Sequence, residues 1–265
     1  MVYMKLSIII LNYKNRNLVK YFLKNVLEFN FDFNWEVVVV DNDSGDNVSR
    51  LIKKDFPVVK FIQNKKNTGM GDGNNIGIEN SSGEYVFIAN PDITLNENAI
   101  KKLVAFLDAH KDAAIAAPQV LNPDKTLQDT CFHWPNFFTF LYRRTFLGST
   151  KKGKKNLSKF IYRREDLVNE TEVDWVLGGC FMVKRSALDV IGLFDNRFFL
   201  FLEDTDLCRR IWLHGMQVWY LPSAKIIHLP HRLSSGTGSI KDMFSRLTWV
   251  HLASWVKYFW KWRNK

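Results

Sequence analysis

The chain has 265 residues, of which 46% are hydrophobic and 24% charged, a composition that is typical of a globular protein and excludes a disordered or fibrous chain. This length is sufficient for one large α/β domain, or for one domain with an appendage. The formal net charge of +10 favours anionic partners such as nucleic acid, anionic lipid or a phosphorylated substrate.

The N-terminal part of the chain alternates between short apolar runs and helical patterns. The runs at 6–11 and 35–40 are rich in β-branched residues and predict strands buried on both faces, and the run at 58–62 predicts a third strand. Apolar residues at helical spacing predict helices at 18–27 and 48–52. Because the connections are short, this β-α-β-α-β order predicts an α/β protein with a parallel, doubly wound sheet.

Polar residues follow each of these predicted strands. They are Asn12 and Tyr13 after the first strand, Asp41 and Asn42 after the second, and Asn64 and Asn67 after the third. Asparagine and aspartate are common in loops and helix caps, so each one alone has a structural explanation. Ligands of parallel α/β sheets bind beyond the carboxyl ends of the strands, however, and three consecutive polar strand ends favour a ligand site there.

A glycine-rich stretch, NTGMGDGNNIGIE, covers residues 67–79. Its spacing is not GxGxxG, and the chain has no GxxxxGK[ST] loop, so the sequence argues against a nicotinamide enzyme and against a P-loop ATPase. Gly69, Gly71 and Gly73 are expected to let the backbone approach a ligand closely before a helix at 74–78.

A fourth apolar run, at 85–89, ends in Asn90-Pro91-Asp92. Pro91 ends the strand because it has no N–H for the sheet and its φ angle is fixed. Asp92 is therefore expected at the carboxyl edge of the sheet, where a single carboxylate suits a hard cation that also binds water and a substrate diphosphate. The alternative is a simple turn aspartate.

The middle of the chain changes character. A short apolar run at 113–117 precedes a segment at 132–164 that is aromatic, strongly basic and without clear periodicity. We expect this segment to be a mobile excursion or lid. A buried pattern returns at 173–183, where the pair Gly178 and Gly179 indicates a bend or a close approach to a ligand.

An acidic cluster follows the apolar run in the stretch FFLFLEDTDLCRR (198–210). Carboxylates beside an apolar run are costly unless they face a cation, a proton-transfer partner or water. The alternative is a helix N-terminus, where acidic residues favour the helix dipole and Asp204 or Thr205 caps free N–H groups. Because the polar strand ends supply a site for the cluster to face, we favour a catalytic role for Asp204.

The remaining residues predict two short strands, at 217–221 and 225–228, and a C-terminal helix. His228 ends the second strand, and a lone histidine is more often structural than a metal ligand. Residues 244–262 place aromatic and basic side chains at near-helical spacing. Such an amphipathic helix is suited to a membrane interface, to packing on the body of the protein, or to a homodimer contact.

Cysteine usage and hydropathy indicate the compartment. Cys131, Cys180 and Cys208 form no CxxC pair and predict buried thiols in a reducing environment. The N-terminal apolar run is too short for a signal peptide, and no window approaches the ~20 apolar residues of a membrane span. We expect a cytoplasmic protein, peripheral on the inner face of the cell membrane.

Taken together, the motifs resemble glycosyltransferase family 2, whose members are inverting enzymes with the GT-A fold, and more narrowly its rhamnosyltransferase-like branch. The matching stretches are SIIILNY (7–13), VVVVDNDSGD (37–46), NTGMGDGNNIGI (67–78), NPD (90–92), WVLGGCFMVKR (175–185) and FLEDTDLCRR (201–210). They occur in the family's order. The resemblance implies a Rossmann-like, mostly parallel central sheet flanked by helices, with a GT-A domain at 1–235 and a helical appendage at 236–265. The domain would consist of a nucleotide-sugar-binding half at 1–118 and an acceptor-binding half at 119–235.

The same resemblance implies roles for individual residues. The nucleotide-sugar would be bound by Asn12, Tyr13, Asp41, Asn42, Asn67, Gly69, Asn74, Asn90 and Asp92. Asn90 stands where many relatives have the first Asp of an Asp-x-Asp motif, so Mg²⁺ or Mn²⁺ would be bound by Asp92, with His228 completing the site. The acceptor would contact Trp175, Gly178, Gly179 and Glu203. Asp204 would be the general base, with Asp206 and Arg209 as supporting partners on the same helix.

The implied reaction is transfer of a sugar from a nucleotide-sugar to a hydroxyl of a cell-surface polysaccharide or lipid-linked glycan. The rhamnosyltransferase-like motifs favour dTDP-β-L-rhamnose as donor, and UDP-galactofuranose or a UDP-hexose is the alternative. A hypothesis of a different class is a non-catalytic protein that binds nucleic acid or anionic lipid. The aromatic residues are not interleaved with the basic ones on a recognisable nucleic-acid module, so no nucleic-acid partner is expected.

Overall fold

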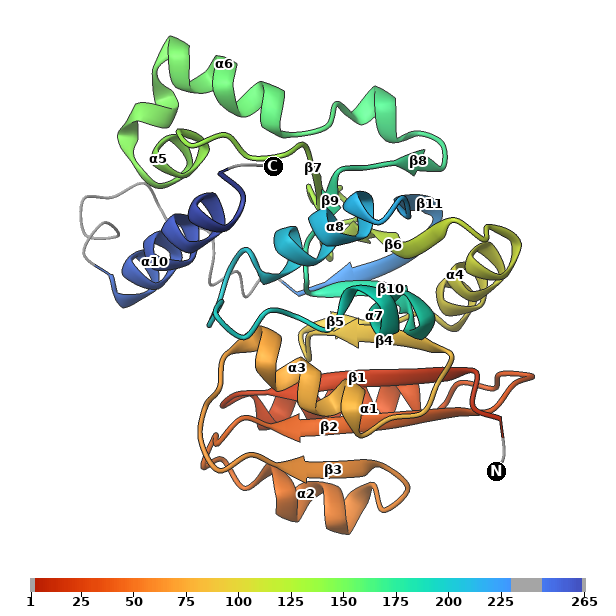
Figure 1. Cartoon of the computed structure of the whole chain (residues 1–265). Helices are drawn as coiled ribbons and strands as arrows, with labels where there is room; N and C mark the ends of the chain where they lie inside the picture. Colours follow the sequence, from red (N-terminus) through yellow and green to blue (C-terminus); the bar gives the residue numbers. More distant parts are fainter. Residues whose placement is uncertain (1–2, 230–244, 264–265) are drawn as a thin grey trace.

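The predicted apolar runs lie in one large sheet in the structure, a computed structural model that describes residues 3–229 and 245–263 (Figure 1). Over these residues the sheet contains β1 (Leu6–Asn12), β2 (Trp35–Asp41), β3 (Lys60–Gln63), β4 (Tyr85–Ala89), β5 (Ile93–Thr94), β6 (Ala113–Leu121), β8 (Thr171–Glu172), β10 (Cys180–Lys184) and β11 (Gln217–His228). A small second sheet pairs β7 (Cys131–Phe132) with β9 (Trp175–Val176).

Helices connect and cover these strands. The α-helices are α1 (Arg16–Val26), α2 (Val48–Asp55), α3 (Met70–Glu79), α4 (Glu97–Ala109), α5 (Thr139–Arg144), α6 (Lys151–Phe160), α7 (Arg185–Ile191), α8 (Glu203–Leu213) and α10 (Arg246–Lys261). Two short 3₁₀ helices are η1 (Phe146–Ser149) and η2 (Arg164–Leu167).

The sheet is mostly parallel, which confirms the predicted fold class. Its order is β3-β2-β1-β4-β10-β6-β11-β5, with β8 also paired to β11, and β3, β2, β1 and β4 run parallel. β10 is antiparallel to both of its neighbours, whereas β6 and β11 are parallel to each other. Asn12 pairs in register with Asp41, so the polar ends of β1 and β2 meet at one edge of the sheet.

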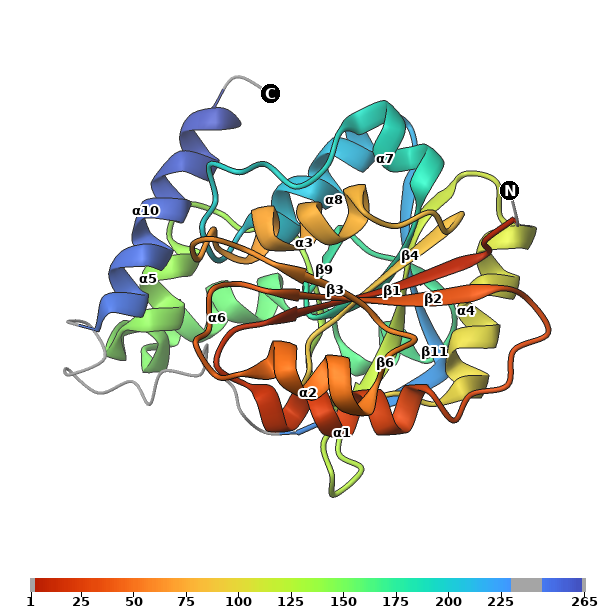
Figure 2. The ribbon, with the colours of Figure 1, turned by 90° about the horizontal axis from the view of Figure 1, so that it is seen from below.

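Both faces of the sheet are buried, which explains the continuous apolar runs of its central strands. α1, α2 and α4 pack on one face, and α3, α7 and α8 pack on the other (Figure 2). Ile8 and Ile10 of β1 belong to the first core and Ile9 belongs to the second. Alternating side chains of one strand therefore stabilise both layers.

Three strand predictions change in the structure. β6 continues through Pro118, so residue 118, where we expected the two halves of the domain to meet, lies inside a strand. Pro118 has no N–H to donate, and the pairing of β6 with β10 ends two residues earlier, at Ala116. The two strands predicted at 217–221 and 225–228 are one strand, β11, whose register against β6 shifts between Leu221 and Lys225. The buried pattern at 173–183 is two strands of different sheets, β9 and β10.

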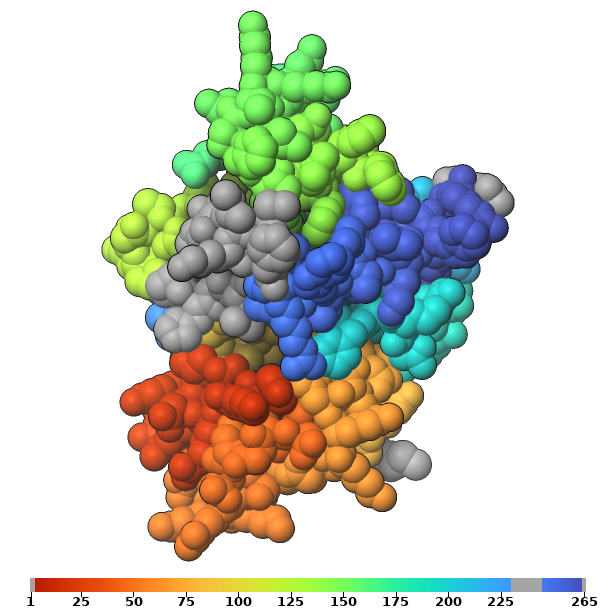
Figure 3. All heavy atoms as spheres, turned by 90° about the vertical axis from the view of Figure 1, so that its left-hand side faces the viewer, coloured from red at the N-terminus to blue at the C-terminus, as the bar shows by residue number. Residues whose placement is uncertain are grey.

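The basic segment at 132–164, in which the sequence showed no clear periodicity, is largely helical in the structure: it contains α5, η1 and α6. Helix α10 lies beside this segment on the molecular surface (Figure 3). Trp255, Tyr258 and Trp262 form a third hydrophobic cluster with Phe198 and Leu202 of the body. Of the three roles predicted for the C-terminal helix, packing on the body is therefore present, whereas Phe244 lies outside the described residues.

The structure bears on two observations that we used to predict the cellular compartment. Cys131, Cys180 and Cys208 are free and buried, as predicted. Among residues 3–229 and 245–263, no helix combines the length and hydropathy that a membrane crossing needs.

Candidate active site

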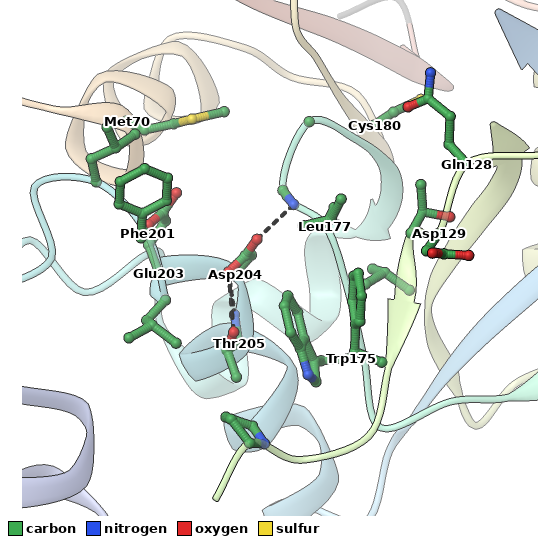
Figure 4. A pocket seen from close by; sticks show the side chains of 18 of the residues that line it. Met70, Gln128, Asp129, Trp175, Leu177, Cys180, Phe201, Glu203, Asp204 and Thr205 are labelled. Carbon is green, nitrogen blue, oxygen red and sulfur yellow. Dashed lines mark hydrogen bonds between the residues drawn. The ribbon is translucent and has the colours of Figure 1, made fainter. Parts of the chain in front are cut away.

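A cavity of about 440 Å³ lies beyond the carboxyl end of β4. Parts of the chain that are distant in sequence line it: the β4 end with Asn90 and Asp92, His228 at the end of β11, the turn 177–179, the segment 200–205, and side chains of α5 and α10. Figure 4 shows Asp204 beside the 177–179 turn, with Gln128 and Asp129 across the cavity. The structure thus brings the acidic cluster and the Asn90-Pro91-Asp92 turn to one cavity.

Asp204 lies in the first turn of α8 and accepts hydrogen bonds from two backbone N–H groups, one of them outside the helix. Its Oδ2 accepts the N–H of Gly178 at 2.8 Å, and its Oδ1 accepts the N–H of Thr205 at 2.7 Å (Figure 4). The N-cap of α8 is Leu202, which has no side-chain cap hydrogen bond, so the prediction that Asp204 or Thr205 caps this helix is wrong; the Asp204 carboxylate instead accepts the N–H of the next residue. The two bonds fix the orientation of the carboxylate.

The turn that leads into α8 has an unusual backbone. Phe201 and Leu202, neither of them glycine, have φ angles of 70° and 68°. Such left-handed conformations cost on the order of 1–3 kcal/mol each and persist only where surrounding contacts enforce them. This backbone sets the direction in which Glu203 and Asp204 leave the chain.

Both carboxylates of this turn hold protons more tightly than ordinary acidic residues. Burial raises the pKa of Asp204, and the hydrogen bonds from Gly178 and Thr205 partly oppose that shift. Burial, followed by the neighbouring Asp204 carboxylate, raises the pKa of Glu203 well above its usual value. Glu203 Oε2 is buried and has no hydrogen-bond partner among the described residues.

A second pair of titratable side chains lies at the end of β4. Asp92 Oδ2 is 3.2 Å from His228 Nε2, and His228 Nδ1 is 2.9 Å from Gln128 Oε1. Asp92 Oδ1 is buried and has no hydrogen-bond partner among the described residues. These donors fit a hard cation whose other ligands come from a diphosphate and water. Across residues 3–229 and 245–263, no cluster of three or more His, Cys, Asp or Glu side chains would bind a metal without such help.

The predicted nucleotide-binding residues at the first three strand ends form a hydrogen-bonded cluster outside the cavity lining. Asn12 Nδ2 donates to Asp41 Oδ1 at 2.8 Å. Asn42 Nδ2 donates to Asn67 Oδ1 at 2.9 Å and to the Gly69 carbonyl at 3.0 Å. Asn12, Asp41 and Asn42 are all buried. These polar side chains therefore hold the strand-end loops together, whatever they contact in a complex.

Other predicted nucleotide-binding residues differ in their surroundings. Tyr13 is 43% exposed beside this cluster. Asn74 Nδ2 donates to the Met70 carbonyl at 3.0 Å, and its Oδ1 is buried without a partner among the described residues. Gly69 has φ of 89°, and a Cβ there would lie 2.1 Å from the Phe199 carbonyl oxygen. Gly69 therefore allows a close approach to the backbone of Phe199, in the segment that leads to α8, whereas the sequence predicted a close approach to a ligand.

The residues predicted to bind the acceptor lie together around Asp204. A Cβ on Gly178 would lie 3.1 Å from Asp204 Cβ, and one on Gly179 would lie 2.8 Å from Asn90 Nδ2. The two glycines therefore let the 177–179 turn approach both the acidic turn and the β4 end. Trp175 is buried and donates from Nε1 to the His133 carbonyl at 3.0 Å, so its ring forms part of a fixed wall.

Sequence reasoning missed several residues that line the cavity. Arg143 and Arg144 come from α5, and His251 and Trp255 come from α10. The pair Arg143-Arg144 stood out in the sequence only as part of a basic segment, and nothing in the sequence pattern indicated His251. Arg144 Nε donates to His251 Nδ1 at 3.1 Å. Burial, followed by the charges of Arg144 and Arg143, lowers the pKa of His251 to about 3, so the ring is neutral at physiological pH.

The fold resembles that of solved nucleotide-sugar enzymes. The mannosyltransferase PcManGT from Pyrobaculum calidifontis, solved in complex with GDP-Man and Mn²⁺, superposes with a TM-score of 0.57 at 18% sequence identity. The match covers 88% of this chain and 59% of that chain, so this chain spans less than two thirds of the length of the solved enzyme. At this identity the likeness shows the fold alone.

Curated relatives are closer in sequence. An N-acetylglucosaminyl-diphospho-decaprenol L-rhamnosyltransferase from Mycobacterium tuberculosis is 28% identical over 232 residues, which cover 83% of this chain and 73% of the relative. Rhamnosyltransferase WbbL from Escherichia coli K12 is 24% identical over 258 residues, which cover 95% of this chain and 91% of the relative.

The model of one protein family, Glycosyl transferase family 2, matches residues 7–192. The match begins in β1 and ends just after α7, so it includes the strand-end cluster, Asp92 and the 177–179 turn. Because it extends over more than half of the chain, the protein belongs to glycosyl transferase family 2 and is a glycosyltransferase.

Proposed function

We propose that the protein transfers L-rhamnose, with inversion, from dTDP-β-L-rhamnose to a hydroxyl of a cell-surface polysaccharide or lipid-linked glycan intermediate. The observation that carries this proposal is the cavity itself, where a buried carboxylate fixed by two backbone N–H groups shares one space with the Asp92–His228 pair. The names of the M. tuberculosis and E. coli relatives support rhamnose as the transferred sugar and a diphosphate-linked lipid as part of the acceptor.

Asp204 is the general base of this mechanism. It takes the proton from the acceptor hydroxyl while that oxygen attacks the anomeric carbon, and the bond to the departing nucleoside diphosphate breaks. Attack from the side opposite the leaving group accounts for inversion. The bonds from Gly178 and Thr205 hold the carboxylate still as the acceptor approaches, so less reorganisation is needed in the transition state.

Glu203 orients the acceptor. Its raised pKa means that it keeps a proton to a higher pH than an ordinary glutamate, and it lines the same cavity as Asp204. A protonated Glu203 can therefore form a hydrogen bond with an acceptor hydroxyl without placing a second negative charge beside Asp204. Trp175, Gly178 and Gly179 complete this acceptor side.

The donor lies on the opposite side. Asp92 and His228 would hold Mg²⁺ or Mn²⁺, and such a cation would stabilise the negative charge of the diphosphate leaving group. Asn90 contacts the ribose, while the base is bound by the strand-end cluster and its neighbours: Asn12, Tyr13, Asp41, Asn42, Asn67, Gly69 and Asn74. The Mn²⁺ in the solved mannosyltransferase complex supports a divalent cation here.

A donor screen tests the proposal. Thermal unfolding with Mn²⁺ and dTDP-L-rhamnose is expected to show a larger rise in Tm than with UDP-galactofuranose, UDP-glucose or GDP-mannose, because ligand that binds only the folded state stabilises it. Incubation with dTDP-L-rhamnose and a diphospholipid-linked N-acetylglucosamine should then release dTDP. A larger rise in Tm and faster turnover with a UDP-sugar would show that this UDP-sugar, and not dTDP-L-rhamnose, is the donor.

The surface beside the cavity fits an anionic membrane, and we propose that the protein associates with one. Trp249, Val256 and Trp260 form an exposed stripe along α10, with 58%, 55% and 70% of their surfaces exposed. Exposed Phe137 packs edge-on against Phe259 of α10. The exposed lysines of α6 lie in the neighbouring segment: Lys151, Lys152, Lys154, Lys155 and Lys159. Aromatic anchors with adjacent lysines suit anionic headgroups.

Vesicle binding tests this surface. The wild-type protein is expected to sediment with vesicles that contain phosphatidylglycerol and not with pure phosphatidylcholine. The double change Trp249→Ala and Trp260→Ala should weaken binding roughly tenfold, since each ring loses apolar burial in the interface. Tyr21→Ala, which removes an aromatic ring that is 69% exposed on α1, is the control and should bind like the wild type. Unchanged binding of the double variant would show that the stripe does not contact lipid.

A further inference from the structure

The C-terminal helix α10 contacts the strained turn before α8 on several sides. Leu202, with its left-handed backbone, packs with Trp255 and Tyr258 of α10 and with Trp262, which directly follows the helix. Among the described residues, the members of this hydrophobic cluster come from the 198–202 segment, α5 and α10, and not from the central sheet. The cluster therefore supports the turn separately from the two main cores.

The other strained residue, Phe201, is enclosed by ring and charge contacts. Its ring stacks on His251 of α10 with a centroid distance of 4.4 Å, and the Arg144 guanidinium lies 5.5 Å from the same ring. Arg144 also donates to His251. Because His251 is neutral, its stacking contact and its role as acceptor do not change between mildly acidic and neutral pH.

Polar contacts fix the same segment along its length. Ser254 Oγ donates to the Leu200 carbonyl at 2.8 Å, and Lys257 Nζ donates to the Arg197 carbonyl at 2.7 Å. Lys261 Nζ lies 2.8 Å from Asp195 Oδ2 and 2.6 Å from Asp206 Oδ1. One lysine thus joins the two ends of the segment that carries Glu203 and Asp204.

Asp206 is the contact point on α8 itself. It is fully buried and is bound by Arg210 Nε at 3.0 Å, by Lys261, and by Trp262 Nε1 at 3.0 Å. Arg209 Nη1 donates to the hydroxyl of Tyr258 at 3.1 Å. The two residues that the family resemblance predicted as supporting partners of Asp204 therefore act as attachment points for α10.

We propose that α10 is a positioning element for catalysis, in which Lys261 and its partners hold Phe201 and Leu202 in their left-handed conformation and so direct Glu203 and Asp204 toward the cavity. The proposal rests on the proposed function in one respect, namely that Asp204 is the base. The proposed effect is local. Without α10, Phe201 and Leu202 relax to ordinary φ angles and the Glu203 and Asp204 carboxylates are no longer held in one orientation, while the central sheet stays intact.

Lys261→Met tests the proposal, because it keeps most of the side-chain stem and removes the charge that joins Asp195 to Asp206. Amide hydrogen exchange of peptides spanning 198–206 is expected to accelerate about fivefold or more, with exchange in β1 and β4 unchanged. With dTDP-L-rhamnose and the lipid-linked acceptor, kcat should fall roughly tenfold while KM for the donor stays within about twofold. Lys24→Met, at an exposed lysine on α1, is the matched control and should leave both measurements unchanged.

Ser254→Ala is the second variant, in case Lys261→Met does not fold. It removes one bond to Leu200 and is expected to change the same measurements in the same direction by a smaller factor. Uniform acceleration of exchange in all peptides, no acceleration in 198–206, or an unchanged kcat in these variants would each overturn the proposal. Hydrogen exchange needs no substrate, so it decides the positioning of the turn even if the donor proves not to be dTDP-L-rhamnose.

Discussion

Asp204→Asn is expected to lower kcat by about 10²–10⁴-fold, the usual contribution of a general base. The amide has nearly the shape of the carboxylate but cannot take the acceptor proton. It also replaces one of two oxygen acceptors by an NH₂ group, so either the Gly178 or the Thr205 N–H loses its partner. Removal of a buried charge offsets part of that cost, and we expect the variant to fold.

The measurement is steady-state transfer together with calorimetric binding of dTDP in the presence of Mn²⁺. Binding should remain within a few-fold of the wild type because the residues that we propose for the donor include neither Asp204 nor its hydrogen-bond partners. Asp189→Asn, at an exposed aspartate of α7, is the control and should be fully active. Near-full activity of Asp204→Asn would rule out this residue as the base.

The same assignment determines the sign of the pH dependence. Burial raises the pKa of Asp204 above its ordinary value of 3.8, so the carboxyl is protonated over a wider acidic range than a surface aspartate. A protonated carboxyl cannot act as a base. Wild-type kcat/KM is therefore expected to fall as pH decreases through this raised pKa, and the fall should begin at a higher pH than an exposed aspartate would give.

Asp92→Ala is expected to abolish the effect of Mn²⁺ on donor binding. In the wild type, calorimetry should show tighter dTDP binding with Mn²⁺ than with EDTA. The variant should bind dTDP equally weakly in both, since it lacks the carboxylate whose Oδ1 is buried and whose Oδ2 lies beside His228. Transfer should fall by roughly 10²-fold or more, because charge stabilisation by a cation contributes several kcal/mol.

Two further variants sharpen this result. His228→Gln keeps Asp92 and should retain part of the Mn²⁺ effect. Asp124→Ala, in an exposed turn, should behave like the wild type. If EDTA leaves wild-type binding and transfer unchanged, the Asp92–His228 pair serves the donor without a cation, and the metal assignment fails.

The sequence by itself determined the elements whose environment is uniform along their length. The central residues of β1, β2 and β4 are buried on both faces, so apolar residues occupy consecutive positions and each run is visible without knowing its neighbours. The polar strand ends and the acidic stretch were visible for the opposite reason. Carboxylates and amides next to such runs have no place in an apolar core, so their presence indicates a site.

Only the tertiary structure decided how these parts meet. β11 is one strand because β6 pairs with it on both sides of a register shift, and α10 is attached to the body because Asp195 and Asp206, more than fifty residues earlier in the chain, face Lys261. The left-handed backbone of Phe201 and Leu202 and the entry of His251 into the cavity have no local signal. Contacts between residues distant in sequence enforce them, and periodicity within one segment reports only the faces of that segment.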